Sequence, residues 1–357
     1  MKEISLFAPH VPNEAINEVS DVLNSGCVTQ GSRVESFEKN FSNLFNVKYP
    51  VSLNSGSSAL ELAYELVGLQ EGDEVITTPL TCAATNIPLL HKKVKIVWAD
   101  INPNTLCIDL KDVGKKITDK TKAIVQVHLG GIRASLGNYE MDVPVISDAC
   151  QALGVFSGDY TCCSFQAIKH FTTGDGGMLV VNNEKEYKKS KLLRWFGVDR
   201  ERKIPNDWTS YRTRMMSFDI ELAGYKKHMN DIDAALGLVG LLHYSEILQY
   251  RRKLFYMYEK MLSGVDGIKI VNGEENVYWL FTILVERRDD FARMLYDAGV
   301  ETNLVQVRND GYKVFGGKKA DLPNLASIEN KYISLPIGMH VKEEEVNYIC
   351  SKIRNGW

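Results

Sequence analysis

Hydrophobic residues in the first half of the chain recur with two different periods, which predict alternating helices and strands. Spacings of three and four residues predict amphipathic helices at Glu14–Leu23, Val34–Phe45 and Ala59–Val67. Short apolar runs predict strands at Tyr49–Leu53, Val75–Thr77, Val94–Trp98, Ala123–Val127 and Val143–Ile146. Strands that alternate with helices are typical of a mostly parallel sheet sandwiched by helices, so we expect an α/β fold. Ser32 is the expected N-cap of the second helix.

The second half of the chain predicts a helical link and a smaller domain. Asn230 precedes a helical run at Ile232–Leu242, and a second run follows at Ser245–Leu262. Beyond them, the pattern predicts strands at Gly267–Val271 and Tyr278–Val285 and helices at Asp289–Ala298 and Lys342–Ile353. We therefore expect a large domain at residues 1–240 and a smaller C-terminal α+β domain at residues 241–357.

Composition excludes several classes of partner. The chain has 357 residues and a net charge of −3, which argues against a nucleic-acid or membrane-surface partner. Its start lacks a secretory signal pattern, and no apolar run is long enough to span a bilayer. The seven cysteines are odd in number and lack zinc-binding spacing. We therefore expect reduced thiols, no metal site and a cytoplasmic enzyme.

Polar residues follow several predicted strands at the points where those strands end. They are Gly56-Ser57-Ser58, Thr81-Cys82, His128, Asp148 and Ser164. In open sheets of this kind, ligands bind at the carboxyl ends of the strands. These residues are therefore expected to line one crevice.

The stretch from Ser164 to Gly177 combines a lysine with a glycine-rich turn. Lys169 follows Ser164 by five positions, and Gly174-Asp175-Gly176-Gly177 then leads into another apolar run. A lysine that is shielded from water beside such a turn has a lowered pKa and becomes a nucleophile, as a Schiff-base lysine must be. The alternative is a solvated surface lysine beside a tight turn, which is the commoner situation for a single lysine.

Two further segments have alternative interpretations. Asn54–Leu60 joins a strand to a helix, and its free N–H groups and hydroxyls either bind an anion or form an ordinary serine N-cap. Asp148 either pairs with a protonated ring nitrogen or caps a helix.

A cofactor with an aldehyde, a phosphate and a pyridine ring, pyridoxal phosphate (PLP), would satisfy one set of residues together. That set is Lys169, Asp148, Gln151, Ser57, Ser58 and Ser164.

The sequence resembles the DegT/DnrJ/StrS-type sugar aminotransferases, PLP enzymes of the aspartate aminotransferase fold (type I). The shared motifs include SGSSAL, GDEVITTPLT, the Asp-x2-Gln that begins at Asp148, and SFQAIKHFTTGDGG. The resemblance implies that Lys169 holds PLP as an imine and that Asp148 keeps the pyridine nitrogen protonated. It implies that Gln151 lies on the ring hydroxyl side, and that Ser57, Ser58 and Ser164 hold the phosphate. It also implies a homodimer in which a Gly-Tyr-Asn segment reaches the partner's phosphate.

The chain departs from the family pattern at Lys226, at Cys82 and at His228, which stands where an arginine often follows the Gly-Tyr-Asn segment. Lys226 replaces the asparagine of the Gly-Tyr-Asn segment, and as a point charge it can still bind phosphate. Cys82 takes the position of an aromatic residue that stacks on the PLP ring. Some relatives replace the lysine with histidine and dehydrate the sugar, but the spacing from Ser164 assigns the imine to Lys169. His170 is then a packing, hydrogen-bonding or substrate-contacting residue.

The resemblance implies transfer of an amino group from L-glutamate to a keto sugar carried on a nucleoside diphosphate. Arg308 and Trp195 are the first candidates to contact the nucleotide sugar, with Arg194, Arg200, Arg202 and Lys203 nearby in sequence. The alternative for these residues is a solvated loop. The alternative functions are a PLP-dependent sugar dehydratase and a catalytically inactive regulatory relative.

Overall fold

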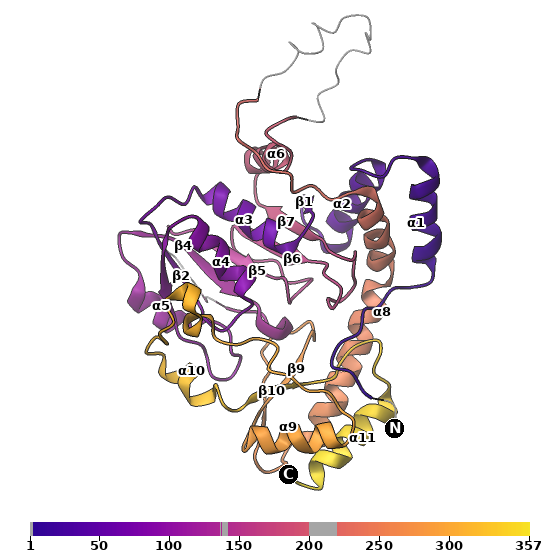
Figure 1. Ribbon diagram of the computed structural model, residues 1–357, viewed down its shortest axis with the longest axis vertical. Helices are drawn as coiled ribbons and strands as arrows, with labels where there is room; N and C mark the ends of the chain where they lie inside the picture. Colours follow the sequence, from indigo (N-terminus) through magenta and orange to yellow (C-terminus); the bar gives the residue numbers. More distant parts are fainter. Residues whose placement is uncertain (1–2, 136, 138–141, 200–219) are drawn as a thin grey trace, which may run out of the picture.

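A seven-stranded sheet forms the centre of the computed structural model, which describes residues 3–135, 137, 142–199 and 220–357 (Figure 1). Its strands lie in the order β1-β7-β6-β5-β4-β2-β3, and among these described strands β7 alone runs opposite to the others. The bounds are β1 (Tyr49–Leu53), β2 (Glu74–Thr77), β3 (Lys95–Trp98), β4 (Thr121–Val127), β5 (Val145–Asp148), β6 (Tyr160–Ser164) and β7 (Gly177–Val181). The mostly parallel α/β sheet expected from the sequence is confirmed.

Helices pack on both faces of this sheet. On one face, α3 (Gly56–Val67), α4 (Ala83–His91) and α6 (Glu184–Leu193) share an apolar core with the strands. On the other face, α2 (Ser32–Phe45) and the first half of α8 (Asp231–Leu262) form a second core, and α1 (Glu14–Ser25) packs along α8. Cys162 belongs to the first core and Cys163 to the second, because successive strand residues point to opposite faces.

Helix α8 is continuous over 32 residues, whereas the sequence pattern predicted two helical runs. Asn230 caps it as expected, because its side chain accepts the backbone N–H of Asp233. The first half of α8 packs on the large sheet, and its second half, with Leu254 and Tyr258, packs under a smaller sheet. The helix thus passes through residue 240, and the division at that residue stays a prediction.

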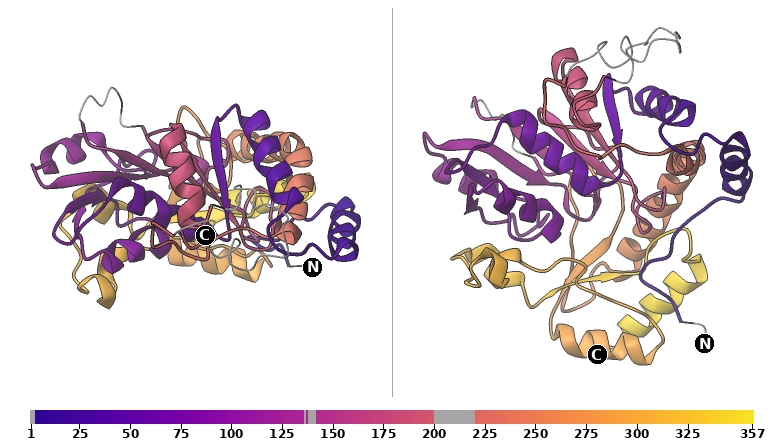
Figure 2. Two further views of the ribbon diagram at one scale, coloured as in Figure 1. Left: turned by 90° about the horizontal axis from the view of Figure 1, so that it is seen from above. Right: turned by 45° about the horizontal axis from the view of Figure 1, so that its top comes forward.

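The smaller sheet is antiparallel, with the order β10-β9-β8, and forms the expected C-terminal α+β unit. It comprises β8 (Ile268–Ile270), β9 (Phe281–Val285) and β10 (Tyr332–Leu335), with α9 (Arg288–Asp297) and α11 (Glu343–Arg354) against it. Both termini lie beside α9 and α11 (Figures 1 and 2), and Ile4 pairs with Val300 in this core. Two short helices, α5 (Leu110–Lys116) and α10 (Pro323–Ile328), share a third apolar core with residues of both sheets. No helix in the described ranges has the length and hydrophobicity of a membrane span.

The predicted cap of α2 is wrong. The helix begins at Ser32 itself, and no side chain of its own first turn caps it. Instead, the Asp231 carboxylate accepts the backbone N–H groups of Gly31 (2.7 Å), Arg33 (3.3 Å) and Val34 (3.1 Å). A negative charge at a helix N-terminus is favourable, so the first residue of α8 fixes the start of α2.

Candidate active site

A cavity of about 400 Å³ lies at the carboxyl edge of the large sheet. It is lined by residues that the sequence predicted to meet there: Ser57, Cys82, Asp148, Gln151, Ser164 and Lys169. His128, which also ends a strand, is fully buried and does not line it. The single crevice expected from the strand ends is therefore present, but Ser58, Thr81 and His128 do not line it.

The Lys169 amine lies inside this cavity rather than on the open surface. The residue is half-buried, and burial lowers the pKa of its amine. Its Nζ atom lies 4.0 Å from the centroid of the Trp279 ring. This placement does not fit a solvated surface lysine, and it favours a nucleophilic amine.

The Asp148 carboxylate is held from two sides. Its Oδ2 accepts the hydroxyl of Thr85 at 2.7 Å, and its Oδ1 accepts the backbone N–H of Cys150 at 3.1 Å. The second bond closes a local turn and is not the helix N-cap that the sequence offered as an alternative, because no helix lies between β5 and β6, a stretch that the structure describes throughout; the side chain still lines the cavity. Gln151 is fixed in turn, because its Oε1 accepts the backbone N–H of Gly130 at 2.9 Å.

The two serines at the start of α3 have different environments. Ser57 lines the cavity, whereas Ser58 does not. The Ser58 hydroxyl donates to Asn54 Oδ1 at 2.7 Å, and its backbone N–H donates to Ser55 Oγ at 3.0 Å. Ser55 is thus the N-cap of α3, and Ser57 is the hydroxyl presented to a ligand at the helix N-terminus.

Lys226 and Trp195 lie away from this cavity. Lys226 is exposed, and its main chain pairs with that of Trp195. Trp195 is half-buried, lines a separate cavity of about 650 Å³ between α2 and α6, and packs on the His228 ring with centroids 4.1 Å apart. Cys82, by contrast, is exposed at the cavity wall beside the start of α4.

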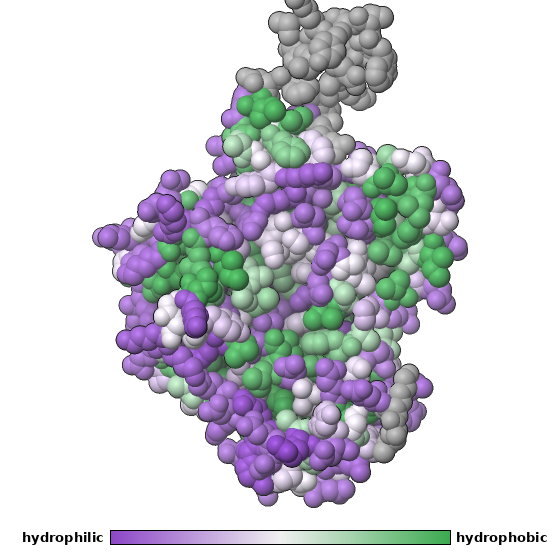
Figure 3. All heavy atoms as spheres, viewed as in Figure 1, coloured by the Kyte–Doolittle hydropathy of each residue, from purple (hydrophilic) through white to green (hydrophobic). Residues whose placement is uncertain are grey.

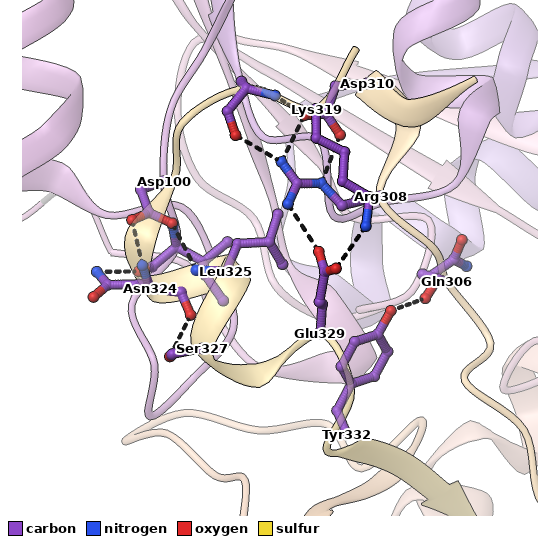
Figure 4. Close-up of polar contacts among 12 residues, drawn as sticks. Asp100, Gln306, Arg308, Asp310, Lys319, Asn324, Leu325, Ser327, Glu329 and Tyr332 are labelled. Carbon is purple, nitrogen blue, oxygen red and sulfur yellow. Dashed lines mark hydrogen bonds and ion pairs between the residues drawn. The ribbon is translucent and has the colours of Figure 1, made fainter. Parts of the chain in front are cut away.

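Arg308, expected to contact the nucleotide, is buried in an ion-pair cluster (Figure 4). Its Nη2 donates to Asp310 at 2.7 Å, and its Nη1 donates to Glu329 at 2.9 Å. The carboxylate of Glu329 also accepts a hydrogen bond from Lys319 Nζ, with Nζ and Oε1 2.6 Å apart. The structure therefore does not bring Arg308 to the cavity, because its guanidinium joins two segments of the smaller unit.

His170 and Arg194 are also buried and outside the cavity. The Nε2 of His170 is 2.7 Å from the carbonyl oxygen of Val277, and burial lowers the pKa of the imidazole to about 3, so the ring is neutral. Arg194 pairs with Glu38 beneath β1. Arg200, Arg202 and Lys203 lie outside the described residues.

Several cavity residues were missed by sequence reasoning. Four residues line the cavity from segments that are distant in sequence from the predicted motifs, and no local pattern marked them: Phe7, Trp279, Val305 and Gln306. Val305 has a φ of +60°, a rare conformation for a β-branched residue. Thr85 could have been found, since it follows the predicted β2 strand end.

Comparisons with known proteins give a consistent assignment. The spore coat polysaccharide biosynthesis protein SpsC of Bacillus subtilis is 31% identical over 97% of this chain and 95% of that protein. GDP-perosamine synthase of Escherichia coli O157:H7 is 27% identical over 99% of this chain and 98% of that protein. The crystal structure of AtS13 from Actinomadura melliaura superposes with a TM-score of 0.92 at 33% identity and covers 100% of both chains. Residues 9–354 match the model of one family, so the chain belongs to the DegT/DnrJ/EryC1/StrS aminotransferase family.

Proposed function

We propose that this protein uses PLP to transfer an amino group from L-glutamate to a keto sugar linked to a nucleoside diphosphate. The observation that supports this most strongly is the shared cavity of the Lys169 amine and the Asp148 carboxylate. Membership of an aminotransferase family supports the reaction class. A relative named GDP-perosamine synthase supports a nucleotide-linked sugar as substrate.

The residues of the cavity themselves fit PLP. At Gly56, a Cβ atom would lie 2.8 Å from both Cys150 Sγ and Ser164 Cβ, so only glycine lets the start of α3 approach so closely. That helix N-terminus, with Ser57 and Ser164, suits a phosphate. Asp148 suits a protonated ring nitrogen, and Lys169 suits an aldehyde.

PLP supplies an aldehyde that condenses with amines and a ring that accepts electrons. Lys169 would hold the cofactor through Nζ and, once displaced by the amino donor, would carry a proton between carbon atoms of donor and cofactor. Asp148, oriented by Thr85, would pair with the ring nitrogen. Gln151 would lie beside the ring hydroxyl, oriented by the backbone of Gly130.

The decisive test replaces Lys169 with alanine. Lys169→Ala should abolish both turnover and the visible absorption of lysine-bound PLP, whereas Lys122→Ala, an exposed lysine on β4, should retain both. The substrate assay uses a panel of nucleotide-linked keto sugars with L-glutamate. Full activity in Lys169→Ala would refute the assignment. A dehydrated sugar without incorporated nitrogen would support the dehydratase alternative, and a wild-type protein that binds no PLP would support the inactive relative.

We also propose a homodimer whose two active sites lie at the subunit interface. Among the described residues that line the cavity, Lys169 is the only lysine or arginine, although the ligands carry several negative charges. Lys226 is exposed and outside this cavity, so its expected phosphate contact requires a second subunit. Exposed apolar side chains gather over α1 (Figure 3), with Ile16 71% and Leu23 56% exposed.

Subunit complementation tests this arrangement. A mixed dimer of Lys169→Ala and Lys226→Ala subunits contains one intact site only if Lys226 acts across the interface. Activity should therefore return on co-expression of the two variants. If Lys226 acts within its own subunit, the mixed dimer stays as impaired as its parents.

We place the reaction in the cytoplasm. All seven cysteines are free thiols, and such thiols persist in a reducing compartment. Cell fractionation with an antibody to the protein would test this location.

A further inference from the structure

The segment Val277–Leu280, which leads into β9, is hydrogen-bonded to both sequence neighbours of Lys169, namely the side chain of His170 and the main chain of Ile168. The carbonyl of Val277 is 2.7 Å from Nε2 of His170, whose neutral ring donates to it. The indole N–H of Trp279 donates to the carbonyl of Ile168 at 3.0 Å. The residues immediately before and after Lys169 are therefore both held by one short segment of the smaller unit.

The opposite side of this segment packs on the Gly130-Gly131 turn that follows β4. The backbone N–H of Val277 donates to Gly131 at 2.9 Å, and that of Leu280 donates to Gly130 at 2.9 Å. At Gly131, with a φ of +99°, a Cβ atom would lie 2.8 Å from the Trp279 nitrogen. A glycine is therefore needed at this position for the segment to reach the lysine turn.

The segment has an unusual backbone at Tyr278, which has a φ of +56°. For a bulky side chain this conformation is strained, and such strain persists only where the surroundings enforce it. Arg251, buried on α8, supplies part of that enforcement, because its Nη1 donates to the carbonyl of Trp279 at 3.1 Å. The regular strand β9 begins only after this bend, at Phe281, and the Trp279 side chain is buried in the cavity wall.

The Trp279 ring meets the amine itself. Its centroid lies 4.0 Å from Lys169 Nζ, within the range of a cation–π contact. Phe7 stacks on the same ring, with centroids 5.7 Å apart and planes 23° from parallel. The ring is 1% exposed, so it covers the amine and also offers a face that stabilises the charged form.

We propose that Trp279 is a positioning residue for Lys169: its ring receives the amine when the amine is not bonded to cofactor, and its indole N–H fixes the lysine turn. This rests on the proposed function, in which Lys169 must leave the cofactor carbon and stay within reach of it to move a proton. Burial lowers the pKa of the Lys169 amine, and the nearby charge of Asp148 only partly opposes this shift. The aromatic face stabilises the ammonium without adding a charge that would trap it.

The test compares Trp279→Phe and Trp279→Leu with Trp98→Phe, a control at the end of β3 whose ring packs on Phe315 outside the cavity. Trp279→Leu should lower kcat by about tenfold with little change in the KM for L-glutamate. Trp279→Phe keeps a ring face but no N–H donor, so its loss should be smaller. Trp98→Phe should behave like the wild type.

A second readout does not depend on catalysis. In cofactor-free protein, acetic anhydride labels free amines, and mass spectrometry of the Lys169 peptide across a pH series gives the limiting rate of labelling. This limiting rate should rise in Trp279→Leu and, less, in Trp279→Phe, because the ring no longer covers the amine. If Trp279→Leu does not fold, Trp279→Phe decides the question.

Two outcomes overturn the proposal. One is a limiting labelling rate in both Trp279 variants equal to that of Trp98→Phe. The other is a loss of activity that appears only in KM or in the affinity for PLP. Failure of the proposed function gives a different result, because the wild type would then not form lysine-bound PLP, whatever the labelling shows.

Discussion

Replacing Thr85 with valine tests how the Asp148 carboxylate is prepared for a cofactor ring. Thr85 is fully buried, and its hydroxyl donates to Asp148 Oδ2 at 2.7 Å while lying 2.8 Å from the hydroxyl of Thr81. Valine has nearly the same shape without the hydroxyl. The change therefore removes one hydrogen-bond donor to the Asp148 carboxylate, and Asp148 is itself only 4% exposed. The packing of α4 stays nearly unaltered.

The size of the effect follows from the charge on the acceptor. A hydrogen bond to a charged group contributes about 1.5–3 kcal/mol, which corresponds to a factor of about 10–150 in an equilibrium constant. In cofactor-free protein, water in the open cavity can replace the lost donor. When a ring fills the cavity, water cannot reach Asp148, so the loss falls mainly on the loaded state. The affinity of Thr85→Val for PLP should therefore fall by about 10- to 150-fold.

The assay is a spectroscopic titration of cofactor-free protein with PLP at constant pH. Thr85→Ser keeps the hydroxyl and removes only a methyl group, so it is the matched control and should bind PLP within about threefold of the wild type. Thermal unfolding of the cofactor-free variants shows whether both are folded. Wild-type affinity in a folded Thr85→Val would refute the reasoning, because Asp148 would then not carry the ring nitrogen.

Three further outcomes are expected. Asp231→Ala should lower the free energy of unfolding by about 2 kcal/mol in urea, because its carboxylate accepts three N–H groups at the start of α2; an unchanged midpoint would contradict that cap. Burial lowers the pKa of His128 and His170 to about 3, so the unfolded chain binds more protons between about pH 6.5 and 3. Stability is therefore full above pH 6.5 and should fall with acid by up to about 2.7 kcal/mol per pH unit, and His170→Gln should halve this slope in urea titrations at several pH values. Arg194→Met should lower the melting temperature and leave the KM for the nucleotide sugar unchanged, because the guanidinium is buried against Glu38; a raised KM at unchanged stability would restore its substrate role.

Local chemistry explains why much of the site could be predicted. The strand at Tyr49–Leu53 has the bounds that its apolar run indicates, and Asp148 and Ser164 are the last residues of β5 and β6. Parallel strands bring their carboxyl ends to one edge, so residues at those ends meet whatever the intervening helices do. Lys169 follows because only a short turn separates it from Ser164.

Charged residues were harder to place, because sequence shows a charge but not its partner. Arg308 looked like a ligand contact, yet Asp310 lies two residues away and Glu329 comes from the end of α10. Ser32 looked like a cap, yet a carboxylate 199 positions later in the sequence takes that role, and no local pattern encodes such a distance. The sequence pattern also divided α8 into two helical runs. The two halves of this helix pack on different sheets, and the resulting change in the hydrophobic pattern resembles the end of a helix.

The glycine pair after His128 shows where sequence reasoning ends. Two glycines at a strand end indicate that something approaches the backbone closely, and Gly131 does meet the Trp279 nitrogen. The approaching group lies almost 150 positions later, in a bend at Tyr278 that its own residue type disfavours. This unfavourable backbone conformation persists because several elements hold the segment, namely α8, the turn that carries Lys169 and the Gly130-Gly131 turn. The strained residue therefore marks the place where the smaller unit constrains the Lys169 amine, which a search for motifs in the sequence does not reveal.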